Sequence, residues 1–301
     1  MYLITKKAEL TKNIYWMDIL APRVAKSAKP GQFIIVKVSE KGERIPLTIC
    51  DYDRAAGTVA IVFQAMGDST MKLADLNEGD HVHDFVGPLG NPSELIFEDV
   101  EELKAKRILF VAGGVGTAPV YPQIKFLHER GIDVDVVIGT KNWGTLILED
   151  KMKAACKNLY VCTDDGSYGF KGMVTEKIKD LVNNEGIKYD LCVAIGPMIM
   201  MKFVSILTKD LQIPTIVSLN PIMVDGTGMC GACRVTVGKE VKFACVDGPE
   251  FDAHLINFDE AMRRQAMYKS TEGRKQVIAT EKDKHVHKEN CDYREAANEV
   301  K

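Results

Sequence analysis

The sequence has no long hydrophobic run, since none of its apolar stretches approaches the roughly 18 to 20 residues that a membrane-spanning helix needs. Its N-terminus also lacks the apolar core that a secretory signal has behind its first charged residues. These absences predict a cytoplasmic protein with no membrane partner.

Neither sign of charge is in excess, because 39 Lys and Arg residues stand against 42 Asp and Glu residues, for a net charge of -3. A nucleic-acid binder needs an excess of cations to neutralise phosphates, so we exclude nucleic acid as a partner. Cysteine is scarce as well: eight in 301 residues are too few for a disulfide scaffold. What the chain does have is an apolar fraction of 46% and a length typical of about two domains.

The first part of the chain, up to about residue 98, consists of short β-rich runs separated by turns. The runs cover 13–19, 32–38 and 58–63, and Pro30-Gly31, Ala56-Gly57 and Gly79 punctuate them. This spacing is typical of a small antiparallel barrel. We therefore expect a β-barrel domain over 1–98.

From about residue 105 the pattern changes to strands that alternate with helices. Continuous apolar runs at 107–112, 134–138, 158–162 and 191–195 indicate strands buried on both faces, and helices are expected near 119–130, 149–157, 173–184 and 197–210. Alternation of this kind predicts a parallel α/β sheet. We place this second domain at 99–218, a small module at 219–252, and a helix (258–267) with a Lys- and Glu-rich tail at 253–301.

Four candidate metal ligands follow one another in the small module. Asp225, Cys230, Cys233 and Cys245 are separated by four, two and eleven residues, with glycines between them. Apart from the Asp in first place, the first two gaps match the plant-type [2Fe-2S] spacing. A zinc site built on the Cys-x2-Cys pair is the alternative. Asp225 is either a ligand or a turn-forming residue before Gly226.

A glycine turn opens the α/β domain, where the strand 107–112 runs through Gly113, Gly114 and Gly116 into a helix with Pro119 in its first turn. Bare amides at a helix N-terminus suit a pyrophosphate. Pro119 stands where the dinucleotide fingerprint has its third glycine, so this motif alone is not decisive. Two later turns, at 163–167 and 196–198, also follow apolar strands, and the three together favour a nucleotide site at the carboxyl edge of the sheet.

Two stretches of the barrel carry groups that suit a flavin nucleotide. Arg44, Pro46, Leu47 and Thr48 combine a cation, a rigid ring and a hydroxyl, although each is also an ordinary strand or surface residue. Gly67, Ser69 and Thr70 open a short helix, where the hydroxyls suit either a phosphate or plain N-capping.

The order of these parts resembles the ferredoxin-NADP reductase family. The resemblance rests on Arg44-x-Pro46-Leu47-Thr48, on the 113–119 turn, on Gly196-Pro-Met198 and on the C-terminal cysteine motif. Within the family the chain resembles the electron-transfer subunits of dihydroorotate dehydrogenase and, more closely, the small subunit of NADH-dependent reduced ferredoxin:NADP oxidoreductase. Asp225 favours the second group, because the dihydroorotate type has Cys there.

The resemblance implies an α+β multidomain fold: an antiparallel FAD-binding barrel, a parallel α/β NAD(H) domain and a [2Fe-2S] module. It assigns four groups of residues, which are FAD at Arg44, Pro46, Leu47, Thr48 and Val62; the FAD pyrophosphate at Gly67, Ser69 and Thr70; NAD(H) at Gly114, Gly116, Thr117, Asp164, Gly166, Gly196 and Met198; and the cluster at Asp225, Cys230, Cys233 and Cys245. No catalytic side chain is assigned, because hydride transfer between nicotinamide and flavin needs only placement.

The resemblance further implies a flavoprotein subunit that exchanges hydride between NAD(H) and FAD and single electrons between FAD and the cluster. Its partner is expected to be a larger flavin and [4Fe-4S] subunit, and the pair would carry out electron bifurcation among NADH, NADP(H) and ferredoxin. Two alternatives stay open at this point. One is the electron-transfer subunit of an NAD-dependent dihydroorotate dehydrogenase, and the other is a non-enzymatic metal-binding docking module.

Overall fold

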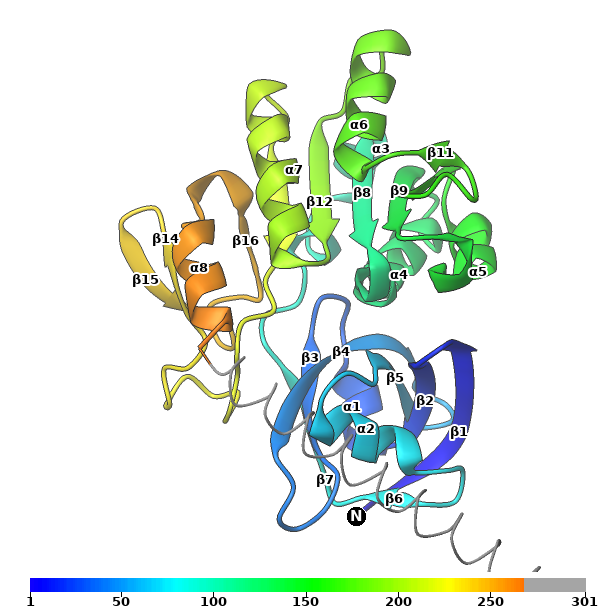
Figure 1. Ribbon diagram of the computed structural model, residues 1–301, viewed down its shortest axis with the longest axis vertical. Coiled ribbons are helices and arrows are strands. Elements are labelled where there is room, and N and C mark those ends of the chain that lie inside the picture. Colours follow the sequence, from blue (N-terminus) through cyan, green and yellow to red (C-terminus); the bar gives the residue numbers. More distant parts are fainter. Residues whose placement is uncertain (268–301) are drawn as a thin grey trace, which may run out of the picture.

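The computed structural model describes residues 1–267. The chain forms a barrel, a parallel-rich sheet with helices on both faces, and a small C-terminal module beside the sheet (Figure 1). The fold class expected from the sequence is confirmed, whereas the tail expected from about residue 270 lies outside the described residues. Within the described part, no helix is both long and apolar enough to cross a membrane.

The N-terminal part is an antiparallel sheet that curls into a nearly closed barrel (Figure 1), with strand order β6-β1-β2-β5-β4-β3-β7. Its elements are β1 (Tyr2–Thr11), β2 (Ile14–Leu20), α1 (Pro22–Ser27), β3 (Phe33–Lys37), β4 (Arg44–Asp53), β5 (Thr58–Gln64), α2 (Asp68–Asp75), β6 (His81–Val82) and β7 (Asp84–Leu89). Inward-pointing residues such as Met17, Ile61 and Phe85 are fully or almost fully buried and fill the barrel. Alternation along the strands therefore produces a packed interior.

The second sheet has the order β11-β10-β9-β8-β12-β13-β16 and is parallel except for β16. Its strands are β8 (Ile108–Gly113), β9 (Val134–Thr140), β10 (Asn158–Thr163), β11 (Phe170–Lys171), β12 (Leu191–Ile195), β13 (Thr215–Ser218) and β16 (Glu250–Asp252). The connecting helices are η1 (Glu94–Ile96), α3 (Val100–Ala105), η2 (Gly114–Gly116), α4 (Thr117–His128), η3 (Trp143–Thr145), α5 (Glu149–Ala155), α6 (Val174–Lys179), η4 (Asp180–Asn184) and α7 (Met198–Asp210).

Both faces of this sheet are covered, which explains the continuous apolar runs in its strands. On one face Phe110 packs with the residues of α4 and α5, and on the other Leu109 and Val111 pack with those of α6 and α7. The chain winds in opposite directions from β8, toward β9 on one side and β12 on the other. The carboxyl ends of β8 and β12 therefore form the switch point where open α/β sheets bind ligands.

Helix α4 joins the sheet to the barrel. Its Tyr121 shares a buried core with Trp16 and Val62 of the barrel, and Lys125 Nζ lies 2.8 Å from the Asp51 carboxylate on β4. The barrel therefore packs against the helix that begins at the glycine turn.

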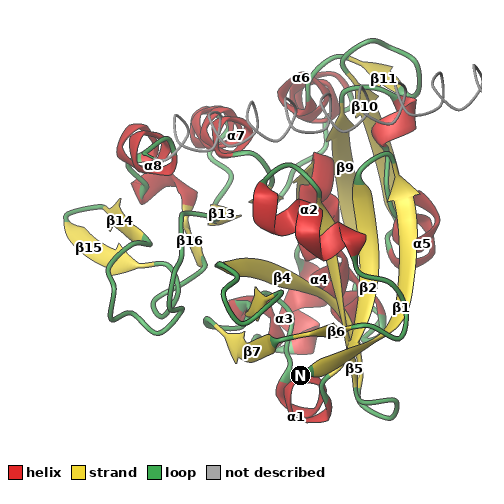
Figure 2. Cartoon of the chain, turned by 60° about the horizontal axis from the view of Figure 1, so that its bottom comes forward, coloured by secondary structure: helices red, strands yellow, loops and turns green. Residues whose placement is uncertain are grey.

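The C-terminal module consists of the hairpin β14 (Arg234–Val237) and β15 (Glu240–Phe243), with η5 (Ala253–Leu255) and α8 (Phe258–Gln265). Figure 2 shows these elements on one side of the molecule, beside β16. Because β16 adds an antiparallel edge strand to β13, the module is attached to the second sheet. A small apolar core that includes Phe33, Ile35 and Cys245 also packs the module against the barrel.

The structure changes some local expectations. The helix expected over 173–184 is α6 followed by a π-helical turn, η4. Strand β13 was not expected, because its four residues are too few for a periodic signal.

Candidate functional site

The glycine turn expected to bind a pyrophosphate does open a helix. Gly114 has a φ of +53°, which a residue with a side chain rarely adopts, and α4 begins directly after Gly116. No side chain caps the first amides of α4, and the Thr117 hydroxyl donates to the Gly114 carbonyl at 2.9 Å. The Thr117 amide is bonded to the Gly114 and Val115 carbonyls and Pro119 has no amide, so what the start of α4 offers an anionic ligand is the positive end of the helix dipole.

The structure brings the turn at 113–116 into direct contact with the turn at 195–198. A Cβ atom on Gly116 would lie 2.3 Å from the Ile195 carbonyl oxygen, and one on Gly196 would lie 3.0 Å from the Gly113 backbone. Only glycine fits at such distances. Two of the predicted nucleotide turns thus lie directly against each other, and buried Met198 starts the helix α7 that follows the second turn.

The third predicted turn, with Asp164 and Gly166, lies along the same edge but is not in this contact. It follows β10, which is two strands from β8, and neighbouring strands are about 4.8 Å apart. Backbone hydrogen bonds connect this turn to the end of β9, because the Asp164 amide donates to the Thr140 carbonyl. The adjacent Ser167 hydroxyl accepts from the Trp143 amide at 2.8 Å. Two strand spacings therefore place these loops about 10 Å from the glycine turn, along the same edge of the sheet.

The predicted flavin residues of the barrel follow one another on β4. Pro46, Leu47 and Thr48 pair with residues of β3 and are partly exposed. Val62 is buried on the neighbouring β5 and packs in the core shared with α4. The row therefore lies on two adjacent barrel strands and leaves part of β4 open to a ligand.

Arg44 begins this row but reaches toward the C-terminal module. Its guanidinium donates to the carbonyl oxygens of Val224 at 3.0 Å and Asp225 at 3.3 Å. No local pattern indicates this link, because the residues are separated by about 180 positions. Arg44 therefore connects the candidate flavin strand to the candidate cluster loop.

The start of α2 is locally self-capped. The Thr70 hydroxyl accepts from the amides of Met66 and Gly67, and the Ser69 hydroxyl donates to the Glu43 carboxylate at 2.8 Å. Nothing lies within 4 Å of a Cβ built on Gly67. The hydroxyls have protein partners here, as plain N-capping requires, while the space above Gly67 stays open.

Asp225 organises the loop that leads to the first cysteine. Its two carboxylate oxygens accept from the amides of Thr227 and Cys230, each at 2.9 Å. The bond from Thr227, with that from Cys230, lowers the pKa of this carboxyl, so Asp225 is an anion at neutral pH. This geometry is that of a turn-forming Asp, and it also presents a carboxylate beside Cys230.

The other two cysteines form a buried pair. The Sγ atoms of Cys233 and Cys245 are 3.3 Å apart, and both side chains are almost completely buried, whereas Cys230 is exposed. Burial, and the neighbouring Cys233, raise the pKa of Cys245 to about 12. Two thiolates at this separation need a compensating cation such as iron or zinc.

Within residues 1–267 no three His, Cys, Asp or Glu side chains gather around a single point at which one metal ion would be held. The candidate ligands lie instead as two neighbouring pairs, Asp225 with Cys230 and Cys233 with Cys245. A two-iron cluster takes two ligands on each iron, so the donor set and its pairing fit such a cluster. A single tetrahedral zinc would require all four at one centre.

Comparison with known protein families gives one family-model match, the iron-sulfur cluster binding domain of dihydroorotate dehydrogenase B, over residues 220–257. A Clostridium beijerinckii protein described as "uncharacterized protein in adh 3'region" is 69% identical over 95% of this chain and 97% of its own. A Thermotoga maritima homolog of the dihydroorotate dehydrogenase B (NAD(+)) electron transfer subunit is 45% identical over 89% and 92%.

Comparison with solved structures also finds electron-transfer reductases. A chain from the structure of NADH-dependent reduced ferredoxin-NADP oxidoreductase, studied for flavin-based electron bifurcation, is 42% identical, with a TM-score of 0.83 over 92% of this chain and 98% of that one. Phthalate dioxygenase reductase shares the fold alone, at 14% identity and a TM-score of 0.53 over 78% and 85%. The chain belongs to the ferredoxin-NADP reductase family, among the flavin and iron-sulfur electron-transfer subunits related to that of dihydroorotate dehydrogenase B.

Proposed function

We propose that this chain is the electron-transfer subunit of an electron-bifurcating NADH-dependent ferredoxin:NADP oxidoreductase. In that complex it would oxidise NADH or reduce NAD(+), depending on the direction of the reaction. The observation that carries the proposal is the 42% identity, over nearly the whole of both chains, to the oxidoreductase structure studied for bifurcation. Asp225 at the first cluster position supports the same assignment. When bound, FAD supplies the conversion between a two-electron hydride carrier and one-electron iron-sulfur chemistry.

The flavin residues in this proposal are Arg44, Pro46, Leu47, Thr48 and Val62, with Gly67, Ser69 and Thr70 at the pyrophosphate. The first four residues are supported by their place on an exposed to partly exposed stretch of β4 that pairs with β3, and Val62 lies buried on the neighbouring β5. The open space above Gly67 supports the second. Ser69 would exchange its bond to Glu43 for a phosphate oxygen, because a dianionic pyrophosphate competes well for a hydroxyl donor.

The nicotinamide dinucleotide is assigned to Gly114, Gly116, Thr117, Gly196 and Met198, with Asp164 and Gly166 in the turn after β10. The positive N-terminal end of α4 orients the pyrophosphate, and the contact between Gly116 and Ile195 holds the two glycine turns together. In this arrangement the protein supplies placement, which for a direct hydride transfer is the main contribution. No proton-transferring side chain is required.

The cluster ligands are proposed to be Asp225 and Cys230 on one iron and Cys233 and Cys245 on the other. The adjacency of each pair supports this division. Arg44 places a cation on the carbonyls of the same loop, so it restrains the loop and offsets the charge of its anionic ligands.

A partner is part of the proposal, because a one-electron carrier at the C-terminal side needs an acceptor. We assign a larger flavin and [4Fe-4S] subunit with its own NADP(H) and ferredoxin sites, in a cytoplasmic heterodimer. Several relatives are named electron transfer subunits, which supports a multi-subunit complex.

The test is a visible spectrum with iron, zinc and flavin analysis of the complex as isolated, followed by anaerobic NADH titration. We expect FAD, cluster absorbance and bleaching of the flavin by NADH. A colourless protein that holds zinc and no flavin would refute the proposal and establish the docking module.

The second candidate is the electron-transfer subunit of a dihydroorotate dehydrogenase. Relatives of that name are 30% to 34% identical, for example 33% over 83% of this chain in Geobacillus thermodenitrificans. Mass spectrometry of the copurifying subunit separates the two, since a dihydroorotate dehydrogenase barrel would select this candidate and an iron-sulfur flavoprotein the first.

A further inference from the structure

Glu250 lies where the three parts of the molecule meet. It is the first residue of β16, five positions after Cys245, and its Oε1 atom accepts from the Gln123 side chain of α4 at 2.6 Å. The Ser93 hydroxyl, after the last barrel strand, donates to the same Gln123 amide. A Cβ on Gly31 of the barrel would lie 3.3 Å from Glu250 Oε1. One carboxyl thus contacts the barrel, the dinucleotide helix and the strand that follows the cluster loop.

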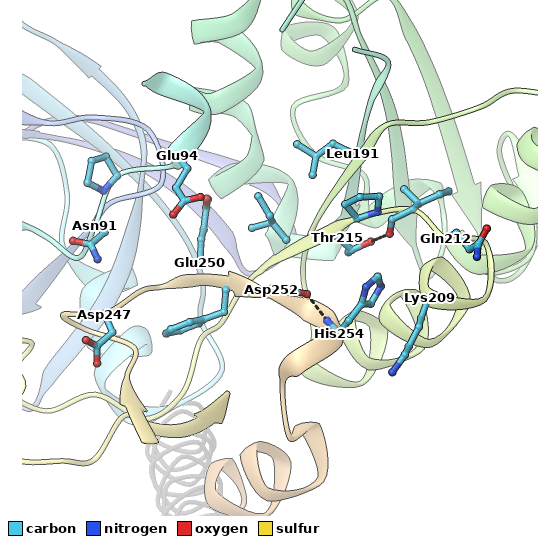
Figure 3. A pocket seen from close by; sticks show the side chains of 15 residues that line it. Asn91, Glu94, Leu191, Lys209, Gln212, Thr215, Asp247, Glu250, Asp252 and His254 are labelled. Carbon is cyan, nitrogen blue, oxygen red and sulfur yellow. Dashed lines mark hydrogen bonds between the residues drawn. The ribbon is translucent and has the colours of Figure 1, made fainter. Parts of the chain in front are cut away.

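A solvent-accessible pocket of about 700 Å³ reaches this carboxyl (Figure 3). Glu94 and Glu250 lie side by side at one end of the pocket. The other charged or titratable groups of the lining are Asp247, Asp252, His254 and Lys209. Glu94 from η1 and Asp247 from the loop after Cys245 add like charge, while His254 and Lys209 line the part formed by η5 and α7. Protons can therefore reach Glu250 from solvent without crossing the apolar core.

The environment of the carboxyl leaves its two protonation states close in energy near neutral pH. Its partner is a neutral amide rather than a cation. Burial raises the pKa of Glu250 to about 7, and the Glu94 carboxylate adds to the rise, while the neighbouring Ser93 hydroxyl and the Gln123 hydrogen bond oppose it. A small change in nearby charge is then enough to change its protonation.

We propose that Glu250 takes up one proton from the pocket when the redox groups of this chain gain an electron, and releases it when they are reoxidised. The proposal rests on the proposed function, from which the electron comes: NADH is the reductant, the cluster iron is reduced, and the O–H bond formed at Glu250 takes its proton from solvent. Charge is thereby balanced inside the junction. Glu250 compensates the added charge and does not touch the reacting atoms, so it is not a catalytic residue.

The strength of the electrostatic coupling between the charge of the cluster and the proton on Glu250 follows from the distance between them. Five residues span at most about 17 Å. At about 15 Å and an effective dielectric constant of about 20, one added charge changes the proton affinity of a carboxyl about sixfold. We therefore expect the protonation midpoint of Glu250 to differ by roughly 0.8 pH unit between oxidised and reduced protein.

The experiment is an anaerobic redox titration of the complex, with the cluster followed by electron paramagnetic resonance, at pH values from 5.5 to 8.5 (about one and a half units on either side of neutrality). In the unmodified complex the cluster midpoint potential should decrease with pH around neutrality and level off on both sides. In Glu250→Gln, which keeps the shape and an acceptor for Gln123, it should be independent of pH. Glu94→Gln is the matched variant: it keeps the pH dependence but moves it to lower pH, because it removes a like charge beside Glu250.

Three results decide against the coupling: a cluster potential that is flat with pH in the unmodified complex, an unchanged pH dependence in Glu250→Gln, or an unshifted one in Glu94→Gln. If Glu250→Gln does not fold, the Glu94→Gln result decides alone. A complex without iron overturns the proposed function and the coupling together, whereas a cluster that ignores pH overturns the coupling only.

Discussion

Replacing Gly116 by alanine tests the contact between the two dinucleotide turns. The added Cβ atom would lie 2.3 Å from the Ile195 carbonyl oxygen and 2.8 Å from the Gly196 Cα atom, whereas ordinary contacts are 3.4 to 4 Å. Both neighbours are backbone, so neither can rotate away, and the turns must separate by about 1 Å. When a reaction depends on how its two partners are positioned, a displacement of this size lowers its rate about a hundredfold.

We therefore expect the rate constant for flavin reduction at saturating NADH to fall roughly a hundredfold in Gly116→Ala, and NADH to bind more weakly. Stopped-flow reduction of the flavin at varied NADH concentrations measures both quantities, with FAD and iron content measured in the same sample. Those contents should not change, because the atoms nearest to the added Cβ belong to Ile195 and Gly196, which lie in neither the barrel nor the cluster loop.

Gly186→Ala is the control. Gly186 precedes β12 at the opposite edge of the sheet, has a φ of +69° and has nothing within 4 Å of its Cβ position. It should lower the free energy of unfolding by about 1 kcal/mol through backbone strain alone, and leave NADH binding unchanged. An unchanged rate of flavin reduction by NADH in Gly116→Ala would refute the assignment of the dinucleotide to these two turns, and combined loss of FAD, iron and NADH binding would show a folding defect instead.

Three further predictions concern the cluster, the sheet and pH. Asp225→Cys should keep the visible cluster spectrum with a changed midpoint potential, while Cys245→Ala should lose iron; complete loss of iron in Asp225→Cys would contradict the ligand set. Asp135→Ala should lower the free energy of unfolding by about 3 kcal/mol in urea titrations, because the carboxylate is 2% exposed and accepts from Arg107, Asn158 and Tyr189; a change below about 1 kcal/mol would contradict this reasoning. Glu250 has a folded pKa above its ordinary value of 4.5, so its contribution to stability is complete below about pH 4.5 and is lost as pH rises through about 7. Glu250→Gln should remove this loss, at most about 3 kcal/mol, in unfolding measured at pH 5 and pH 8 (one to two units on either side of about 7), and equal pH dependence in both proteins would contradict it.

The sequence by itself determined the order and kind of the parts. Short β-rich runs at 13–19 and 58–63, separated by turns, predicted barrel strands, and the continuous run at 107–112 predicted a strand covered on both faces. Glycine spacing predicted the turn before α4, and the structure confirms that a helix begins there. The cysteine spacing likewise marked the module that the family model matches.

Only the tertiary structure decided which of these residues meet. The 2.3 Å approach of Gly116 to Ile195, the reach of Arg44 to the 224–225 carbonyls and the contact of Glu250 with Gln123 each join residues 79 to 181 positions apart. Such pairs leave no periodic signal, since they depend on how β8 pairs with β12, on how β16 pairs with β13 and on how the barrel packs against the rest of the molecule. The pairing of Cys233 with Cys245 is intermediate, because spacing proposed both as ligands but only the fold buried the two sulfurs side by side. Local patterns therefore specify elements, whereas long-range packing specifies the chemistry that those elements bring together.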